Sequence, residues 1–104
     1  MGRKALVRQY DVAAGILEEL PGKTYRFEYR ADYHGPPVSL TMPTSERVHE
    51  FSKFPPVFEG LLPEGMQLEA LLRLRKLDRS DHMGQLLAVG ADVVGSLTIL
   101  PEEE

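Results

Sequence analysis

Apolar and polar side chains alternate most strictly at residues 24–30, TYRFEYR, where Tyr25, Phe27 and Tyr29 share one face. Alternation of period two with aromatic residues is typical of a half-buried β-strand. Similar but looser patterns predict two earlier strands, at residues 4–10 and 16–20, and turns at residues 11–15 and 21–23. The first thirty residues therefore predict an antiparallel meander with one buried face.

The middle of the chain has a weaker pattern. Residues 31–37, ADYHGPP, predict a loop, and residues 38–42, VSLTM, a short strand before Pro43. The polar segment 44–53 is ambiguous, and Thr44 or Ser45 is at most the cap of a short helical turn.

The second half changes to a helical period. Residues 64–76 and 80–89 predict two helices, the second with Asp78 or Ser80 as its N-cap and Gly90 at its end. Residues 93–100, VVGSLTIL, form a β-branched run that is typical of a buried strand. Its backbone needs a partner, and the simplest one is the N-terminal meander.

Together these elements predict an α+β fold. We expect a small, mostly antiparallel sheet or a partly open β-barrel of about five strands, with two to three helices packed on one side. The length of 104 residues fits one domain, residues 1–104, ending in an acidic tail at 101–104.

Composition excludes several classes of function. The formal net charge of −4 argues against autonomous binding to nucleic acid, which depends on cationic contacts with phosphate. The absence of cysteine removes disulfides, thiol catalysis and cysteine-ligated zinc. No apolar run has the roughly 20 residues needed to span a bilayer, and no signal-peptide pattern is present. We expect a cytoplasmic protein without a membrane partner.

Candidate chemistry is sparse. The three histidines, His34, His49 and His82, have no metal-ligand spacing, and neither a phosphate-binding loop nor the HRD and DFG elements of a protein kinase occur. We therefore expect no catalytic residues, no cofactor and no metal site.

Residues 54–72, FPPVFEGLLPEGMQLEALL, combine apolar side chains with helix-breaking prolines and glycines. On a helical wheel Leu68, Leu71 and Leu72 form a stripe about 100° wide, which predicts a core face. Met66 falls about 160° from Leu68, so it points outward unless Phe58 and Leu61 fold back over it. Methionine suits adaptable contact surfaces.

Phe51, Phe54 and Phe58 are also either covered by the fold or exposed for contact with a partner. They form either a lid on the core or an aromatic ledge at the surface.

Three blocks of the sequence resemble the N-terminal subdomain of HipA-like kinases: PPVSLTMP (36–43), FPPVFEGLLPEG (54–65) and DHMGQLLAVGADVVGSLTI (81–99). The blocks keep the family's order and spacing, and the resemblance extends over nearly the whole chain. The chain departs from the family at the turn of residues 10–12 and at Met83, where phenylalanine is common, and it contains no kinase body.

This resemblance implies a function in protein binding. A separate chain of this kind is similar to the HipS-like antitoxins of tripartite HipBST toxin–antitoxin systems. It would neutralise a HipT-like serine/threonine kinase by docking near its active site, while a HipB-like helix-turn-helix protein in the same complex binds DNA. The expected partner-binding residues lie in one segment: Phe58, Leu61, Leu62, Pro63, Glu64, Gly65, Met66 and Gln67.

Two alternatives stay open at this point. The chain is the N-terminal structural subdomain of an active HipA-type kinase, or it is a small β-rich module that binds a peptide or another ligand.

Overall fold

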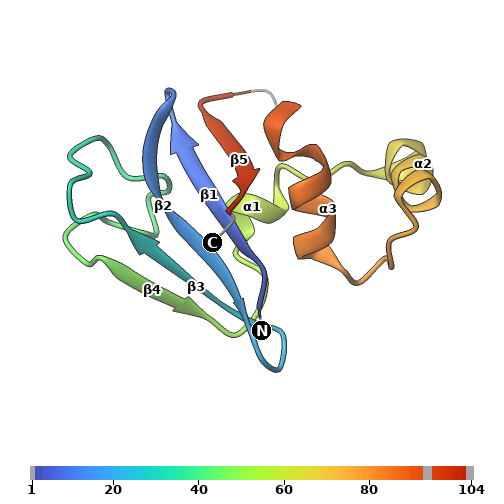
Figure 1. The fold of residues 1–104 in the computed structure, drawn as a ribbon, viewed down its shortest axis with the longest axis horizontal. Coiled ribbons are helices and arrows are strands. Elements are labelled where there is room, and N and C mark those ends of the chain that lie inside the picture. Colours follow the sequence, from blue (N-terminus) through green and yellow to red (C-terminus); the bar gives the residue numbers. More distant parts are fainter. Residues whose placement is uncertain (1, 93–94, 103–104) are drawn as a thin grey trace.

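The computed structural model describes residues 2–92 and 95–102. Within these ranges the chain forms five β-strands, three α-helices and one 3-10 helix (Figure 1). The strands are β1 (Lys4–Gln9), β2 (Val12–Leu20), β3 (Thr24–Tyr29), β4 (Val48–Phe51) and β5 (Leu97–Pro101). The helices are α1 (Pro56–Glu59), α2 (Gly65–Arg75), α3 (His82–Val89) and the 3-10 helix η1 (Gly90–Asp92).

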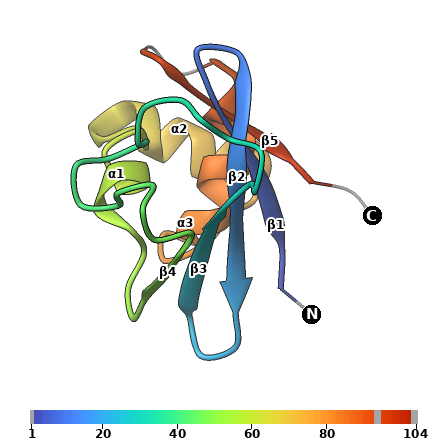
Figure 2. The same ribbon diagram turned by 90° about the vertical axis from the view of Figure 1, so that its left-hand side faces the viewer.

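The five strands form one open sheet in the order β4-β3-β2-β1-β5, and every neighbouring pair is antiparallel. The helices lie on one side of this sheet (Figure 2). The α+β prediction is confirmed, in its open-sheet form rather than as a barrel. The predicted C-terminal strand does join the meander, by pairing with β1. Residues 93 and 94 of that prediction, and Glu103 and Glu104 of the acidic tail, lie outside the described residues.

The hairpin between β1 and β2 is tighter than the sequence pattern predicts. Only Tyr10 and Asp11 form the turn, with φ of 51° and 65°, as a two-residue type I′ hairpin requires. Residues 12–15, which were predicted as turn, belong instead to β2, whose register shifts by one residue at Ala14. A bulge of this kind absorbs an extra residue without ending the strand.

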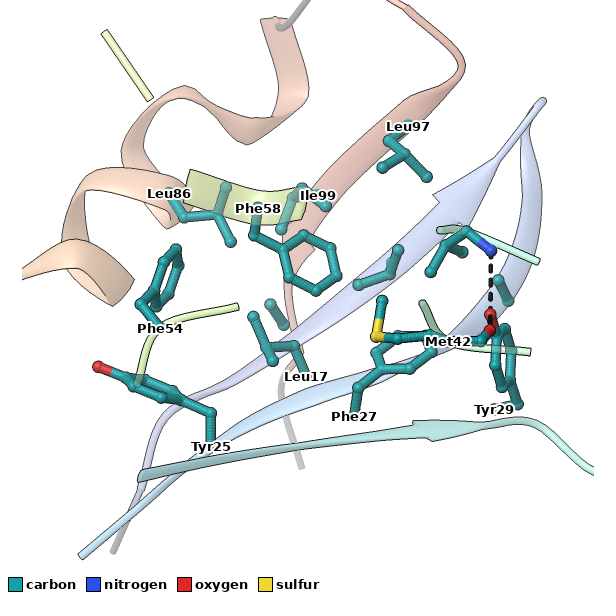
Figure 3. Close-up of a cluster of buried hydrophobic side chains, with 14 of the residues drawn as sticks. Leu17, Tyr25, Phe27, Tyr29, Met42, Phe54, Phe58, Leu86, Leu97 and Ile99 are labelled. Atoms are coloured by element: carbon teal, nitrogen blue, oxygen red, sulfur yellow. Dashed lines mark hydrogen bonds between the residues drawn. The ribbon is translucent and has the colours of Figure 1, made fainter. Parts of the chain in front are cut away.

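The core lies between the sheet and the helices. Tyr25, Phe27 and Tyr29 are all buried on the inner face of β3, as the alternation predicts. Phe58 of α1 and Leu86 of α3 cover them and are themselves 0% exposed (Figure 3). The prediction of a core lid is thus correct for Phe54 and Phe58, which are both buried, whereas Phe51 is half-buried at its edge.

The segment after β3 contains no strand at residues 38–42, so that prediction is wrong. Its backbone turns at Ser39, whose carbonyl accepts from the Met42 amide at 3.0 Å. The Tyr29 hydroxyl accepts from Val38 N at 2.9 Å and donates to Met42 O at 2.5 Å (Figure 3). One buried side chain therefore supplies the hydrogen bonds that a neighbouring strand would have supplied.

The ambiguous segment 44–53 contains the edge strand β4, which pairs with β3. This short strand contains two apolar residues, Val48 and Phe51, on opposite sides, and only the side of His49 and Phe51 is half-buried, so the alternation is weak. The helix predicted at 64–76 is confirmed as α2. The second predicted helix is α3, and its N-cap is Asp81 rather than Asp78 or Ser80, because the Asp81 carboxylate accepts from Gly84 N at 3.0 Å.

Replacing Tyr29 by phenylalanine tests the role of its hydroxyl. Tyr29→Phe leaves the buried Val38 amide and Met42 carbonyl without this partner, so we expect a loss of about 1–3 kcal/mol in the free energy of unfolding. Chemical denaturation monitored by circular dichroism measures the change. Tyr10→Phe is the matched control, since Tyr10 is 69% exposed, and we expect a change within about 0.5 kcal/mol. Equal stability of the two variants would show that the hydroxyl does not hold the loop.

Candidate functional site

The segment that follows β4 is fixed to the core by Phe58. Pro55 and Pro56 begin α1, where the fixed φ of proline suits the first turn of a helix. The Phe58 ring then lies 6.0 Å from the ring of Phe27, centroid to centroid, on the inner face of the sheet. This contact fixes the position of α1 and of the connection that leads from it to the start of α2.

The connection between α1 and α2 turns twice and leaves a short exposed corner. Leu61 and Leu62 follow α1 through turn hydrogen bonds and stay partly buried against the core. Pro63 is half-buried, and Gly65 begins α2 with a φ of 62°, a conformation that glycine adopts without strain. The next residue is Met66, whose side chain is 88% exposed. The prediction that Met66 points outward is confirmed, and Phe58 does not cover it.

The opposite face of α2 differs from the prediction. Leu68, Leu71 and Leu72 are only half-buried, and no residue of α2 is fully buried. They lie outside the hydrophobic core cluster, so their assignment to the core is wrong. The reason is the position of α2, which projects beyond α3 at the end of the molecule (Figure 1) and packs against α3 without reaching the sheet.

A cleft of about 520 Å³ opens beside this corner. Its walls come from the α1–α2 connection, the first turn of α2 and the C-terminal end of α3 with η1. The lining residues are Gly60, Leu61, Leu62, Pro63, Gln67, Ala88, Val89 and Asp92. A cleft lined by both apolar side chains and polar groups is suited to receiving a side chain or a short segment of another molecule.

Charges are separated along α2. Asp92 lies in the cleft and the exposed Glu64 at the N-terminal end of α2, and neither forms an ion pair within residues 2–92 and 95–102. Basic residues gather at the C-terminal end of α2, as Arg73, Arg75 and Lys76, all exposed. Cations are favourable at the C-terminal end of a helix. The two ends of α2 therefore present opposite charge.

Helix α3, which forms the far wall of the cleft, is held to the sheet by a network of three charged residues. The Arg3 guanidinium donates to Glu19 of β2 at 2.8 Å and to the Asp81 carboxylate at 2.6 Å. These hydrogen bonds lower the pKa of both carboxyl groups and raise the pKa of Arg3. Because Asp81 also caps α3, the Arg3 side chain joins the start of this helix to Glu19 of β2, from the position directly before β1.

The expected partner-binding residues do lie together, but not all at the surface. Glu64, Gly65, Met66 and Gln67 are exposed, and Leu61, Leu62 and Pro63 are half-buried. Phe58 is fully buried in the core, against which Leu61 and Leu62 pack.

Two features were missed by the sequence prediction. Ala88, Val89 and Asp92 complete the cleft from a distant part of the chain, and no local pattern indicates this. Leu74 is 79% exposed near the end of α2. The helical wheel places it away from the Leu68 stripe, so that signal was present in the sequence.

The described residues contain no group of three or more His, Cys, Asp or Glu side chains that could hold a metal ion. The Nε2 atom of His49 lies 3.0 Å from the carbonyl oxygen of Pro43. The ring centroid of His82 lies 5.5 Å from that of Phe54. Among the helices in the described ranges, none is long and apolar enough to cross a membrane.

Comparison with known family models and solved structures points to one family. Residues 5–100 match the family described as the HipA N-terminal domain. An uncharacterized protein of Haemophilus influenzae is 29% identical over 102 residues, which cover 98% of this chain and 95% of that protein. A solved structure of the N-terminal domain of HipA toxin superposes with a TM-score of 0.75 at 26% identity, covering 98% of this chain and 94% of that one.

A second structure, from the HipA, HipB and operator DNA complex of a Shewanella oneidensis MR-1 toxin–antitoxin system, has a TM-score of 0.73 at 20% identity. The match covers 96% of this chain but only 24% of that chain. It shows the fold alone. In that longer protein the fold accounts for about a quarter of the chain.

The Arg3 network gives stability a predictable dependence on pH. Because the pKa values of Glu19 and Asp81 are lowered in the folded state, their stabilisation is complete above the unfolded values of about 3.9–4.3 and is lost as pH falls through the folded values. Asp81→Asn keeps a capping side chain but removes the charge. We expect it to be less stable than the unmodified chain at pH 7, and the difference to shrink below about pH 4.

Thermal unfolding at a series of pH values measures this difference. Asp32→Asn is the control, because its partner Arg30 is 50% exposed and Asp32 itself is 73% exposed, and such surface pairs contribute little. A difference between Asp81→Asn and the unmodified chain that stays constant from pH 7 to pH 3 would contradict the ionic role of Asp81.

Proposed function

Because the chain belongs to the HipA N-terminal domain family, we propose that it is an antitoxin that binds and neutralises a HipA-like serine/threonine kinase in the cytoplasm. The matched residues correspond to the N-terminal domain and do not include a kinase body. The H. influenzae relative, of which this chain covers 95%, is of similar length and supports a role for this domain as a separate protein. Neutralisation then proceeds by binding, with the partner supplying the catalytic groups.

The observation that carries the proposal is the position of Met66. It is a large, flexible apolar side chain, 88% exposed, directly after a corner whose backbone is restricted by Pro63. An exposed methionine on a fixed support is suited to entering an apolar pocket on a partner, since its thioether adapts to irregular surfaces. Single buried anchors commonly dominate protein interfaces.

The neighbouring residues support this anchor in different ways. Phe58 fixes the segment to the core, and Leu61 and Leu62 complete its base. Glu64 and Gln67 are exposed on either side of Met66 and provide the polar rim. In the proposed complex, this corner projects towards the active-site cleft of a HipT-like kinase and impedes substrate access or closure.

A HipB-like helix-turn-helix protein completes the proposed complex and supplies contacts with DNA. The net charge of −4 on this chain agrees with such a division of roles, because phosphate contacts need cations. The S. oneidensis structure contains HipA, HipB and operator DNA together, which supports the same type of assembly for this family.

Substitution at Met66 tests the proposal. We expect Met66→Asp to weaken binding to the proposed HipT-like partner kinase by at least about 2 kcal/mol, or about thirtyfold, because it places a charge in an apolar pocket. Growth of cells co-expressing the kinase measures neutralisation, and calorimetry with the purified proteins measures affinity. Since Met66 is exposed, we expect no loss of folding.

The matched control is Leu40→Asp, another exposed apolar residue. Leu40 is 97% exposed and belongs to the loop between β3 and β4, far from α2 (Figure 1). We expect this variant to neutralise fully. Full neutralisation by Met66→Asp, or equal loss in both variants, would exclude Met66 as the anchor.

The alternative function, as the N-terminal subdomain of an active kinase, is favoured by one finding. In the S. oneidensis protein the same fold forms about a quarter of a longer chain. An immunoblot of native cells with an antibody against this domain distinguishes the two, since the antitoxin proposal requires a product of about 11.7 kDa and the alternative a much larger one.

A further inference from the structure

The cleft beside the Met66 corner contains a carboxylate that the proposed function does not use. Asp92 is exposed, and it is the one charged side chain among the described residues that line the cleft. It forms no ion pair within residues 2–92 and 95–102. We propose that the cleft receives an arginine side chain of the partner kinase, whose guanidinium pairs with the Asp92 carboxylate. This inference rests on the proposed function and adds the chemistry that the cleft selects on the partner.

The position of Asp92 on the backbone leaves its charge without compensation. Asp92 is the last residue of η1, which directly follows α3 in the chain. The C-terminal end of a helix carries a partial negative charge, so it favours cations and disfavours a carboxylate. Within their described residues, neither α3 nor η1 has a basic side chain in its last turn. A cation supplied by another molecule therefore stabilises both the helix end and the Asp92 side chain.

The apolar walls of the cleft suit the aliphatic part of a long cationic side chain. Five apolar residues line it: Leu61, Leu62, Pro63, Ala88 and Val89. All five are half-buried, so part of each side chain is accessible to a partner. Arginine packs its methylene stem along such a surface and keeps its charged end at a polar site. A fully apolar side chain would instead remove water from Asp92 without pairing it, which costs free energy.

The acceptors in the cleft favour arginine over lysine. The Asp92 carboxylate can accept two parallel N–H bonds from a guanidinium. Gln67, whose amide oxygen is a further acceptor, lines the same cleft and makes no side-chain hydrogen bond within the described part of the chain. Arginine carries five donors in one plane, and its guanidinium is more weakly hydrated than an ammonium group. It therefore loses less hydration than lysine on entering the cleft and can satisfy both acceptors.

This contact is distinct from the Met66 anchor. Met66 is exposed on the corner and is not among the residues that line the cleft. The anchor enters a pocket of the kinase, whereas the cleft receives a side chain from the kinase. Substitutions at Met66 and at Asp92 therefore alter different properties of the interface, apolar packing in the first case and charge in the second.

Titration of the purified chain with a small probe tests the cleft without the kinase. The probe is Nα-acetyl-arginine amide, and the matched control is Nα-acetyl-citrulline amide, which has nearly the same shape and no charge. In NMR spectra of the isotope-labelled protein, we expect the arginine probe to shift the signals of Gln67, Val89 and Asp92, with a dissociation constant on the order of millimolar. Asp92→Asn is expected to weaken this binding at least about threefold.

Three outcomes of the titration would overturn the inference. They are the absence of shifts at the cleft, equal shifts with the arginine and citrulline probes, and equal binding to Asp92→Asn and the unmodified chain. Tighter binding of Nα-acetyl-lysine amide would contradict the choice of arginine.

Affinity for the kinase provides the second test. In calorimetry with the HipT-like partner kinase, we expect Asp92→Asn to bind at least about tenfold more weakly and with a smaller dependence on salt than the unmodified chain. Asp32→Asn is the matched control. Asp32 is 73% exposed and belongs to the loop between β3 and β4, far from α2 (Figure 1), so we expect unchanged affinity.

The calorimetry separates this inference from the proposed function. Equal affinities of Asp92→Asn and the unmodified chain would exclude the arginine contact and leave the antitoxin proposal intact. No binding of the unmodified chain would instead overturn the antitoxin proposal, and with it the kinase as the source of the arginine.

Discussion

The contact between Phe58 and Phe27 determines where the exposed corner of this protein lies. Phe27 is the central aromatic residue of β3, and the Phe58 ring packs 6.0 Å from it in the middle of the core. Burial of two such rings contributes several kcal/mol, more than any single surface contact in the segment. Since Phe58 belongs to α1, the few residues between it and Met66 have little freedom, and an exposed side chain is held on a rigid base.

The fold divides its two tasks between different parts of the chain. The sheet and α3 hold the core and are joined by the Arg3 network, while the Tyr29 hydroxyl holds the loop at residues 38–42 to β3. Helix α2 contributes no fully buried residue and contacts mainly α3 (Figure 1). Because so little of α2 is buried, packing against the core restricts few of its side chains. The helix can therefore carry Met66 and Leu74 at the surface at small cost in stability.

The sequence predicted those features that depend on regular spacing. Alternation at Tyr25, Phe27 and Tyr29 identified the buried face of β3, and the helical wheel identified Met66 as outward-pointing. Prediction from the sequence failed for features that depend on contacts between residues far apart in the chain. The strand predicted at 38–42 is a loop because Tyr29 supplies its hydrogen bonds. Similarly, the cleft needs Asp92, about thirty residues beyond the corner, and only the tertiary fold brings it there.

The error in the Leu68 stripe has a more general cause. A helical wheel shows which residues share a face, but it does not show how much protein lies opposite that face. Leu68, Leu71 and Leu72 are half-buried together, as their shared side predicts, yet α2 packs against α3 rather than against the sheet. Their partial burial means that α2 is apolar on more than one side without being a core helix. A partner that covered these apolar side chains would add to the burial that α3 provides, which agrees with the binding role proposed for the first turn of α2.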